Sequence, residues 1–100
     1  MSRQQDLQVV LTKYCPNVYF QPPEGHLLKY PCIVYQRADI YSLSANNDVY
    51  FSKDEWSLTV IDYDPDSEIP RHLINELQMC RYGQSYVADN LNHTKLKLYF

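Results

Sequence analysis

The run Thr59-Val60-Ile61-Asp62-Tyr63-Asp64-Pro65-Asp66-Ser67 decides the fold, because it joins a β-branched strand to a polar corner. Residues upstream of the run alternate with a period near two, which predicts a strand over 49–63. Asp66 or Ser67 is expected to cap a second helix, with Pro70 in its first turn. The apolar face of that helix is expected to contain Ile69, Leu73, Leu77 and Cys80. The run therefore predicts a strand that leads directly into a helix.

Two other runs have the same combination of strand-forming residues and a polar corner. The first is Lys29-Tyr30-Pro31-Cys32-Ile33-Val34-Tyr35, which predicts a strand over 32–43. The second is Asp89-Asn90-Leu91-Asn92-His93, which predicts a turn followed by a last strand over 93–100. In that strand, the residues expected to face the core are Leu96, Leu98 and Phe100.

The remaining segments complete an α+β pattern. A first helix is predicted from Ser2 to Tyr14 and ends before Pro16. Short strands are predicted over 17–20 and 85–88, and a polar loop, Ser42 to Asp48, is expected to connect the two long strands. The order α-β-β-β-α-β-β predicts a single domain over 1–100, with two helices packed on one face of a mostly antiparallel sheet.

Composition excludes several classes of function. The chain has 100 residues, a net charge of −3 and no basic block, which argues against sequence-specific nucleic-acid binding. No apolar run approaches the roughly 18 residues of a membrane span. The polar N-terminus lacks the apolar region of a signal peptide, so we expect a cytoplasmic protein without a membrane partner.

The polar residues do not have the spacing of a catalytic or metal site. The three cysteines form no C-x-x-C pair and are expected to be buried free thiols. The acidic residues after the decisive run alternate as calcium ligands do, but Ser67 and Leu73 stand where a calcium loop needs Gly and Glu. Cys80 and His93 could form a nucleophile pair, although a structural Cys80 is favoured. The sequence therefore predicts no catalytic residue, no metal ligand and no cofactor, and we expect a protein that is not an enzyme.

The ten tyrosines exceed what one small core can bury with satisfied hydroxyl groups. Some are therefore expected at the surface, where tyrosine is a common interface residue. The predicted hairpin between the two long strands has a polar tip flanked by aromatic residues. These aromatic residues can cap the core, or they can form a partner contact. The candidate assembly interface is Tyr41, Asn46, Asn47, Tyr50 and Phe51.

The three runs, taken in order, resemble small neck and tail proteins of tailed bacteriophages. The pattern consists of Tyr30-Pro31-Cys32-Ile33-Val34-Tyr35, then Val60-Ile61-Asp62-Tyr63-Asp64-Pro65-Asp66-Ser67 before a helix, then Asp89-Asn90-Leu91-Asn92-His93 before the final strand. It covers roughly residues 17–100 and is most similar to the tail completion or tail terminator proteins of long-tailed phages.

That resemblance implies a virion protein made in the host bacterial cytoplasm. It implies a subunit of a ring, typically a hexamer, at the head-proximal end of the tail tube. Its partners would be copies of itself, the tail tube protein and the head–tail connector proteins. The alternatives are another neck protein, of the head-completion or stopper type, or a small monomeric module that binds one protein.

Overall fold

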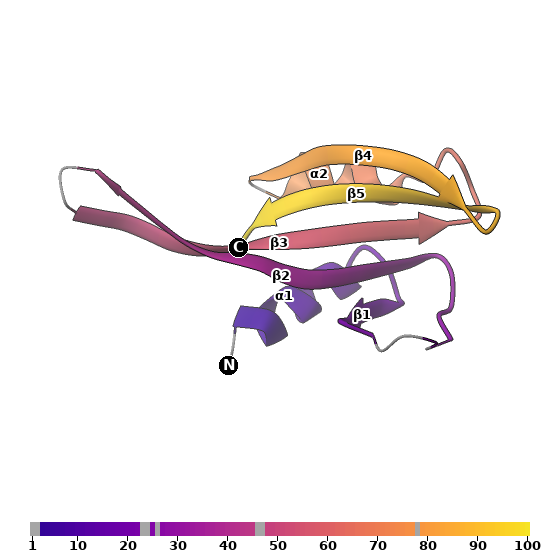
Figure 1. Ribbon diagram of the computed structural model, residues 1–100, viewed down its shortest axis with the longest axis horizontal. Helices are drawn as coiled ribbons and strands as arrows, with labels where there is room; N and C mark the ends of the chain where they lie inside the picture. Colours follow the sequence, from indigo (N-terminus) through magenta and orange to yellow (C-terminus); the bar gives the residue numbers. More distant parts are fainter. Residues whose placement is uncertain (1–2, 23–24, 26, 46–47, 78) are drawn as a thin grey trace.

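The computed structural model describes residues 3–22, 25, 27–45, 48–77 and 79–100, and for 39–45 and 48–53 it describes the backbone. The described chain forms two helices and one five-stranded sheet. In chain order these are α1 (Arg3–Thr12), β1 (Val18–Phe20), β2 (Cys32–Ala45), β3 (Asp48–Asp62), α2 (Ile69–Glu76), β4 (Cys80–Ala88) and β5 (Leu91–Tyr99). Figure 1 shows that β2 and β3 extend well beyond the other strands.

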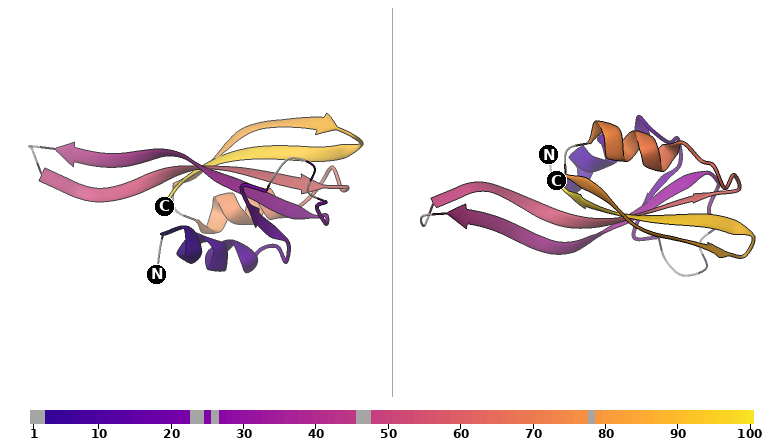
Figure 2. Two further views of the ribbon diagram at one scale, coloured as in Figure 1. Left: turned by 60° about the horizontal axis from the view of Figure 1, so that its bottom comes forward. Right: turned by 90° about the horizontal axis from the view of Figure 1, so that it is seen from above.

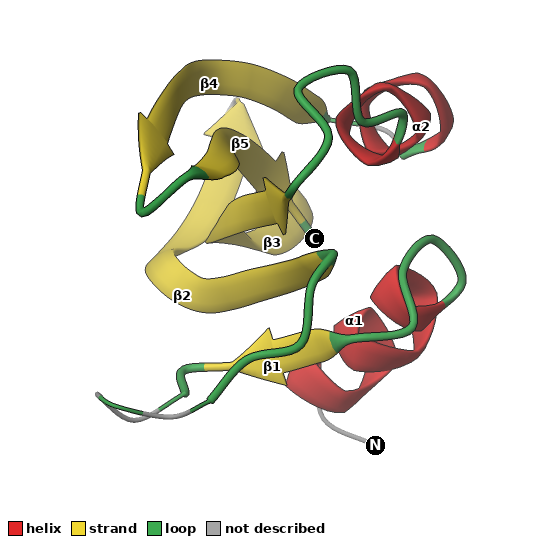
Figure 3. Cartoon of the chain, turned by 90° about the vertical axis from the view of Figure 1, so that its right-hand side faces the viewer, coloured by secondary structure: helices red, strands yellow, loops and turns green. Residues whose placement is uncertain are grey.

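The fold class predicted from the sequence is confirmed. The sheet has the order β1-β2-β3-β5-β4, in which only the β1–β2 pair is parallel. The spatial order differs from the chain order at one edge, where β5 lies between β3 and β4. After β3, the segment containing α2 leads to β4 at the edge of the sheet, and the chain then returns as β5 next to β3. Both helices lie on the same face of the sheet (Figures 2 and 3).

The core lies between the two helices and this covered face. Leu7 and Leu11 of α1 and Leu73 of α2 are fully buried against the sheet. The sheet contributes alternate residues, as the period of two requires. These buried sheet residues are Ile33, Tyr35, Trp56, Leu58, Val60, Cys80, Leu96 and Leu98. Phe100 is partly buried against the same cluster.

The sequence placed the connection between the long strands wrongly. The segment from Ser42 to Asp48 was expected to be a loop, but the β2–β3 ladder continues to the pair Ala45–Asp48. Pairing of Tyr41 with Lys53, Leu43 with Phe51 and Ala45 with Asp48 extends the ladder through this segment, so Ser42 and Ser44 do not interrupt the strand. Hairpin pairing therefore overrides the polar composition of this segment.

The N-cap of α2 lies one residue after the predicted Ser67. Glu68 is the N-cap residue and makes no side-chain cap hydrogen bond. Ser67 Oγ accepts the N–H of Ile69, the first helical residue, at 3.4 Å, and the Asp66 N–H donates to Asp64 Oδ1 at 2.9 Å. Pro70, the second helical residue, has no backbone N–H that a capping side chain could accept. The start of the helix is therefore favoured by the fixed helical φ of Pro70 and by the hydrogen-bonded turn before it.

At the other end of α2, Cys80 begins β4 instead of continuing the helix face, which ends at Glu76. β4 also starts five residues earlier than the sequence predicted, because a register shift between Tyr82 and Gln84 lets the pairing continue past Gly83. A Cβ at Gly83 would lie 2.9 Å from the carbonyl oxygen of Lys95, so glycine permits this close approach.

Candidate functional site

The most distinctive part of the surface is the outer half of the β2–β3 hairpin. β1 pairs with β2 only from Ile33 to Tyr35, and β5 pairs with β3 only from Glu55 to Asp62. Residues 39–45 and 48–53, which we call the arm, pair only with each other within the described part of the chain. The arm gives the molecule its length, since the extents are 49 × 25 × 22 Å (Figure 1). Neither of its long edges pairs with another strand of the described sheet.

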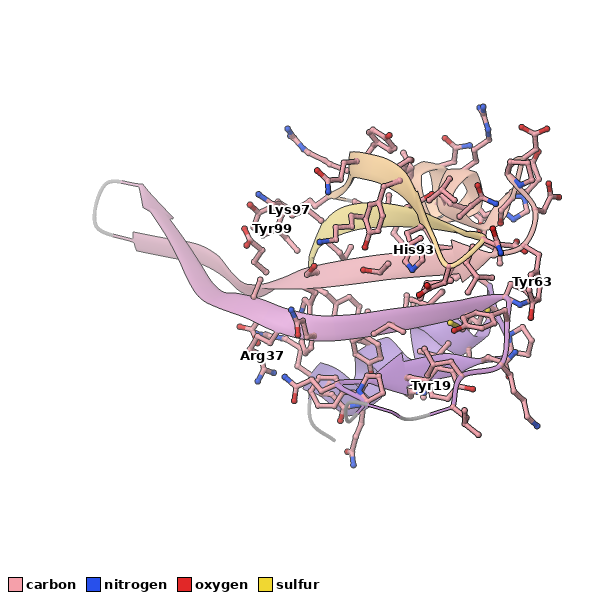
Figure 4. The ribbon with its side chains drawn as sticks, turned by 45° about the vertical axis from the view of Figure 1, so that its right-hand side comes forward. Tyr19, Arg37, Tyr63, His93, Lys97 and Tyr99 are labelled. Atoms are coloured by element: carbon pink, nitrogen blue, oxygen red, sulfur yellow. The ribbon has the colours of Figure 1, made fainter. Side chains whose placement is uncertain are left out.

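A buried carboxylate fixes the base of the arm. Asp54 is 5% exposed, and its Oδ2 lies 2.8 Å from Nε of Arg37 and its Oδ1 lies 3.3 Å from a guanidinium nitrogen of Arg3. The Arg37 guanidinium also lies 4.6 Å from the ring centre of Trp56, a cation–π contact. Figure 4 labels Arg37 where the arm leaves the body. These contacts tie β2, β3 and α1 together at one point.

Backbone hydrogen bonds join the C-terminal residue to the same point. The N–H of Asp54 donates to the carbonyl of Phe100 at 3.1 Å, and the N–H of Phe100 donates to the carbonyl of Asp54 at 2.9 Å. Trp56 Nε1 donates to the Phe100 carbonyl at 3.4 Å. The sheet therefore narrows from three strands to two at Asp54, and the arm starts there.

The residues that the sequence selected lie on this arm as far as the structure describes them. Tyr41 is paired with Lys53, and Phe51 is paired with Leu43. Tyr50 lies at a register shift between the pairs Leu43–Phe51 and Ser44–Val49, so it is the extra residue of a bulge. Asn46 and Asn47 lie outside the described residues. Whether these residues form an assembly interface stays a prediction.

The opposite edge of the sheet is the second distinctive surface. β4 is an edge strand, and every residue from Arg81 to Val87 is exposed. Its exposed large side chains include Tyr82 at 59%, Tyr86 at 39% and Val87 at 69%. A long exposed edge strand is a template for pairing with another strand. β4 is therefore a surface on which another strand can add to the sheet.

Next to this edge, the sheet face opposite the helices carries polar and aromatic groups. The rings of Tyr86 and His93 are stacked, with centres 4.8 Å apart, and Lys95 Nζ lies 5.8 Å from the Tyr86 ring centre. At the arm end of the body, Glu55 Oε1 accepts a hydrogen bond from the Tyr99 hydroxyl at 3.0 Å and lies 3.8 Å from Lys97 Nζ (Figure 4). These contacts fill the exposed face and connect β3, β4 and β5.

The cysteines are buried free thiols, as the sequence predicted. Burial raises the pKa of Cys32 to about 12 and that of Cys80 to about 11, so both thiols are protonated at neutral pH. Cys80 lies in the core on the helix side, whereas His93 pairs with Tyr86 six positions farther along β4. The structure therefore does not bring Cys80 and His93 together as a nucleophile pair.

The acidic corner after β3 forms local turns. Asp62 Oδ1 accepts the Asp64 N–H at 3.1 Å, and Asp64 Oδ1 accepts the Asp66 N–H at 2.9 Å. These side chains satisfy their own backbone, as Asp does in turns. Among the described residues, no group of three or more His, Cys, Asp or Glu side chains is arranged to hold a metal ion.

Sequence reasoning missed the Asp54 cluster, although a signal was present. The charged residues Lys53 and Asp54 interrupt the predicted strand over 49–63, and the register shift between Arg37 and Asp39 lies almost opposite this point. An acidic residue that interrupts an apolar alternation in the middle of a strand needs a cationic partner if it is buried. Arg37 could have been suggested as that partner, but Arg3 is 51 positions away.

Neither helix in the described segments has the length and apolar character needed to cross a bilayer. Comparisons with protein-family models, with curated proteins and with solved structures returned no match.

Proposed function

We propose that this chain is a structural virion protein, the tail terminator or tail completion subunit of a long-tailed bacteriophage. The subunit forms a ring at the head-proximal end of the tail tube and joins the tail to the head. The observation that carries this proposal is the arm, a two-stranded ribbon that extends from a packed body and has two unpaired edges. The α+β class that the phage resemblance implies also agrees with the fold.

The arm suits a ring for a geometric reason. A ring closes through heterologous contacts, so each copy must offer one surface to the next copy and a different surface to the previous one. An arm that reaches beyond the body supplies the first surface, and the body supplies the second. The remaining surface of the ring then faces the tail tube protein on one side and the connector proteins on the other.

The arm also fits a different class of protein, a small monomeric module that binds one partner through a hairpin. The molecular mass in solution separates the two proposals. A ring subunit gives a mass several times that of one chain, either alone or in the presence of tail tubes. A mass of one chain under both conditions favours the monomeric module.

Complementation of a phage that lacks this protein tests the role in the tail. The matched proteins are the parent and a double variant between the sequences of β2 and β3, Asn46→Lys with Asn47→Lys. Charged side chains at an assembly contact block it by mismatch. We expect the parent to restore uniform tails joined to heads, and the double variant to give long, irregular, unjoined tubes under the electron microscope.

Two other outcomes would change the proposal. Tails of normal length without heads, obtained with the double variant, favour a joining role of the head-completion or stopper type. Uniform tails joined to heads, obtained with the same variant, show that residues 46–47 are not an assembly contact.

A further inference from the structure

The edge strand β4 has features that oppose pairing with a further strand in its first half only. Arg81 and the register shift at Gly83 protect the first residues, since charge and bulges are the usual ways to block an edge. The second half, Gln84 to Ala88, is uncharged and keeps a continuous register against β5 from Lys95 to Leu91. This half of the edge has a regular register over five residues, of which 84–87 are exposed, and it is open to another strand.

The arm contains a strand segment of matching length and character. Residues 40–43 of β2, Ile-Tyr-Ser-Leu, are uncharged and rich in β-forming residues. They keep a continuous register against β3, from Ile40–Asp54 to Leu43–Phe51, and their other edge has no neighbour among the described strands. The facing segment of β3, residues 51–54, is less suitable, because it contains the charged residues Lys53 and Asp54.

The two surfaces also have opposite charges. The arm carries Asp39 and Asp48 against a single base, Lys53. The β4 rim carries Arg81, and the neighbouring β5 carries Lys95 and Lys97, both exposed. Arg81 stands directly opposite Lys97 across the ladder. Like charges in that position are unfavourable. Glu55 lies 3.8 Å from Lys97 Nζ within the same copy, and an acidic residue of the arm would add a second negative charge beside Arg81.

We infer that the arm of one copy adds as a strand to β4 of the next copy, with residues 40–43 pairing along residues 84–88. This inference rests on the ring proposed above and names its subunit contact. The contact is heterologous, because a β2 edge meets a β4 edge, so it propagates from copy to copy as ring closure requires. Main-chain hydrogen bonds provide the affinity, as in other cases of β-strand addition. Pairing of β4 with β4 would instead be isologous and would close after two copies.

Hydrogen exchange detects these main-chain hydrogen bonds directly. The full-length protein is compared in its assembled and monomeric forms. We expect amides in both 40–43 and 84–88 to exchange at least about tenfold more slowly in the assembled form. Protection of 84–88 without 40–43 would indicate β4–β4 pairing and would overturn the inference. An oligomer with neither segment protected would overturn it while leaving the ring intact. A mass of one chain at every concentration and with tail tubes added would overturn the ring and the strand pairing together.

A pair of proline variants provides an independent test. In an antiparallel ladder, the N–H groups of adjacent residues point alternately toward and away from the partner strand. Of Gln84→Pro and Ser85→Pro, one therefore removes a bond to β5 and lowers Tm by about 4–8 °C. The other removes only an outward N–H, keeps the parent Tm and should block assembly. If the variant with the parent Tm assembles normally, β4 does not receive a strand.

Discussion

The body and the arm are built from the same two strands, but different forces hold them. In the body, β2 and β3 have side chains buried beneath two helices, and Trp56, Tyr35 and Leu58 are fully buried. In the arm, the same strands have only each other as neighbours in the described sheet. An isolated two-stranded ribbon is marginally stable in water. The free energy of folding therefore comes from the body, and the arm is available for other contacts.

Asp54 marks the boundary between these two regions. On one side of it, β3 has a strand on each side and a helix-covered core. On the other side, β3 has β2 alone. Changes in the body should therefore alter stability, and changes in the arm should alter association. The four predictions below test that division, in order of decreasing effect on stability.

Removing residues 96–100 should abolish folding. The deletion takes away Leu96 and Leu98, which are 3% and 1% exposed, and the Phe100 bonds to Asp54. Each large core truncation costs about 2–5 kcal/mol, against a total stability of about 5–15 kcal/mol. Thermal denaturation followed by circular dichroism should show no cooperative transition. The point variant Leu98→Ala should fold with a lower Tm. A cooperative transition of the truncated chain at the parent temperature would contradict the prediction.

Asp54→Asn should lower the free energy of unfolding by about 1–3 kcal/mol, because it weakens two charge-assisted contacts of a buried group. Asp64→Asn is the matched control, since an exposed Asn keeps the oxygen that accepts the Asp66 N–H. The control should stay within about 0.5 kcal/mol of the parent. Urea denaturation measures both values. Equal stability of the two variants would show that Asp54 does not hold the base of the arm.

Most of the body could be predicted from the sequence, because burial there imposes a clear period. Leu96 and Leu98 alternate with lysines, and Leu7 and Leu11 have helical spacing. The arm could not be delimited, because Ser42 and Ser44 are typical loop residues in sequence, and only the ladder that continues to the pair Ala45–Asp48 shows that they belong to a strand. The Asp54 cluster and the exposed edge of β4 also depend on neighbours distant in sequence. They become visible only when the order β1-β2-β3-β5-β4 is known.

The third prediction concerns the end of the body away from the arm, where Cys32 packs with Ile61 and Leu91. Burial raises the Cys32 pKa from 9.0 to about 12, so the folded state holds the thiol proton more tightly than the unfolded state does. This contribution is complete below pH 9 and is lost as the pH rises from 9 toward 12. Relative to Cys32→Ala, the parent should lose up to about 1.4 kcal/mol per pH unit in that range.

Urea denaturation at about pH 7, 9 and 10 measures this difference. Comparing the parent with Cys32→Ala at each pH cancels the titration of the lysines and tyrosines that both proteins share. A constant difference between the two proteins from pH 7 to 10 would mean that water reaches the Cys32 thiol in the folded state.

The smallest effect on stability and the clearest effect on assembly are expected from a pair of lysine substitutions on β2. Ser42→Lys lies on the arm, and Gln36→Lys lies six residues earlier at an exposed position of the body. Both should leave the free energy of unfolding within about 0.5 kcal/mol of the parent, as surface changes usually do. A lysine on a strand edge opposes pairing with another strand. Only Ser42→Lys should therefore prevent ring formation, measured by the mass of the complex and by tail length in complementation.

If both variants assemble like the parent, the arm takes no part in association. If both fail, the contact extends onto the body and is not confined to the arm.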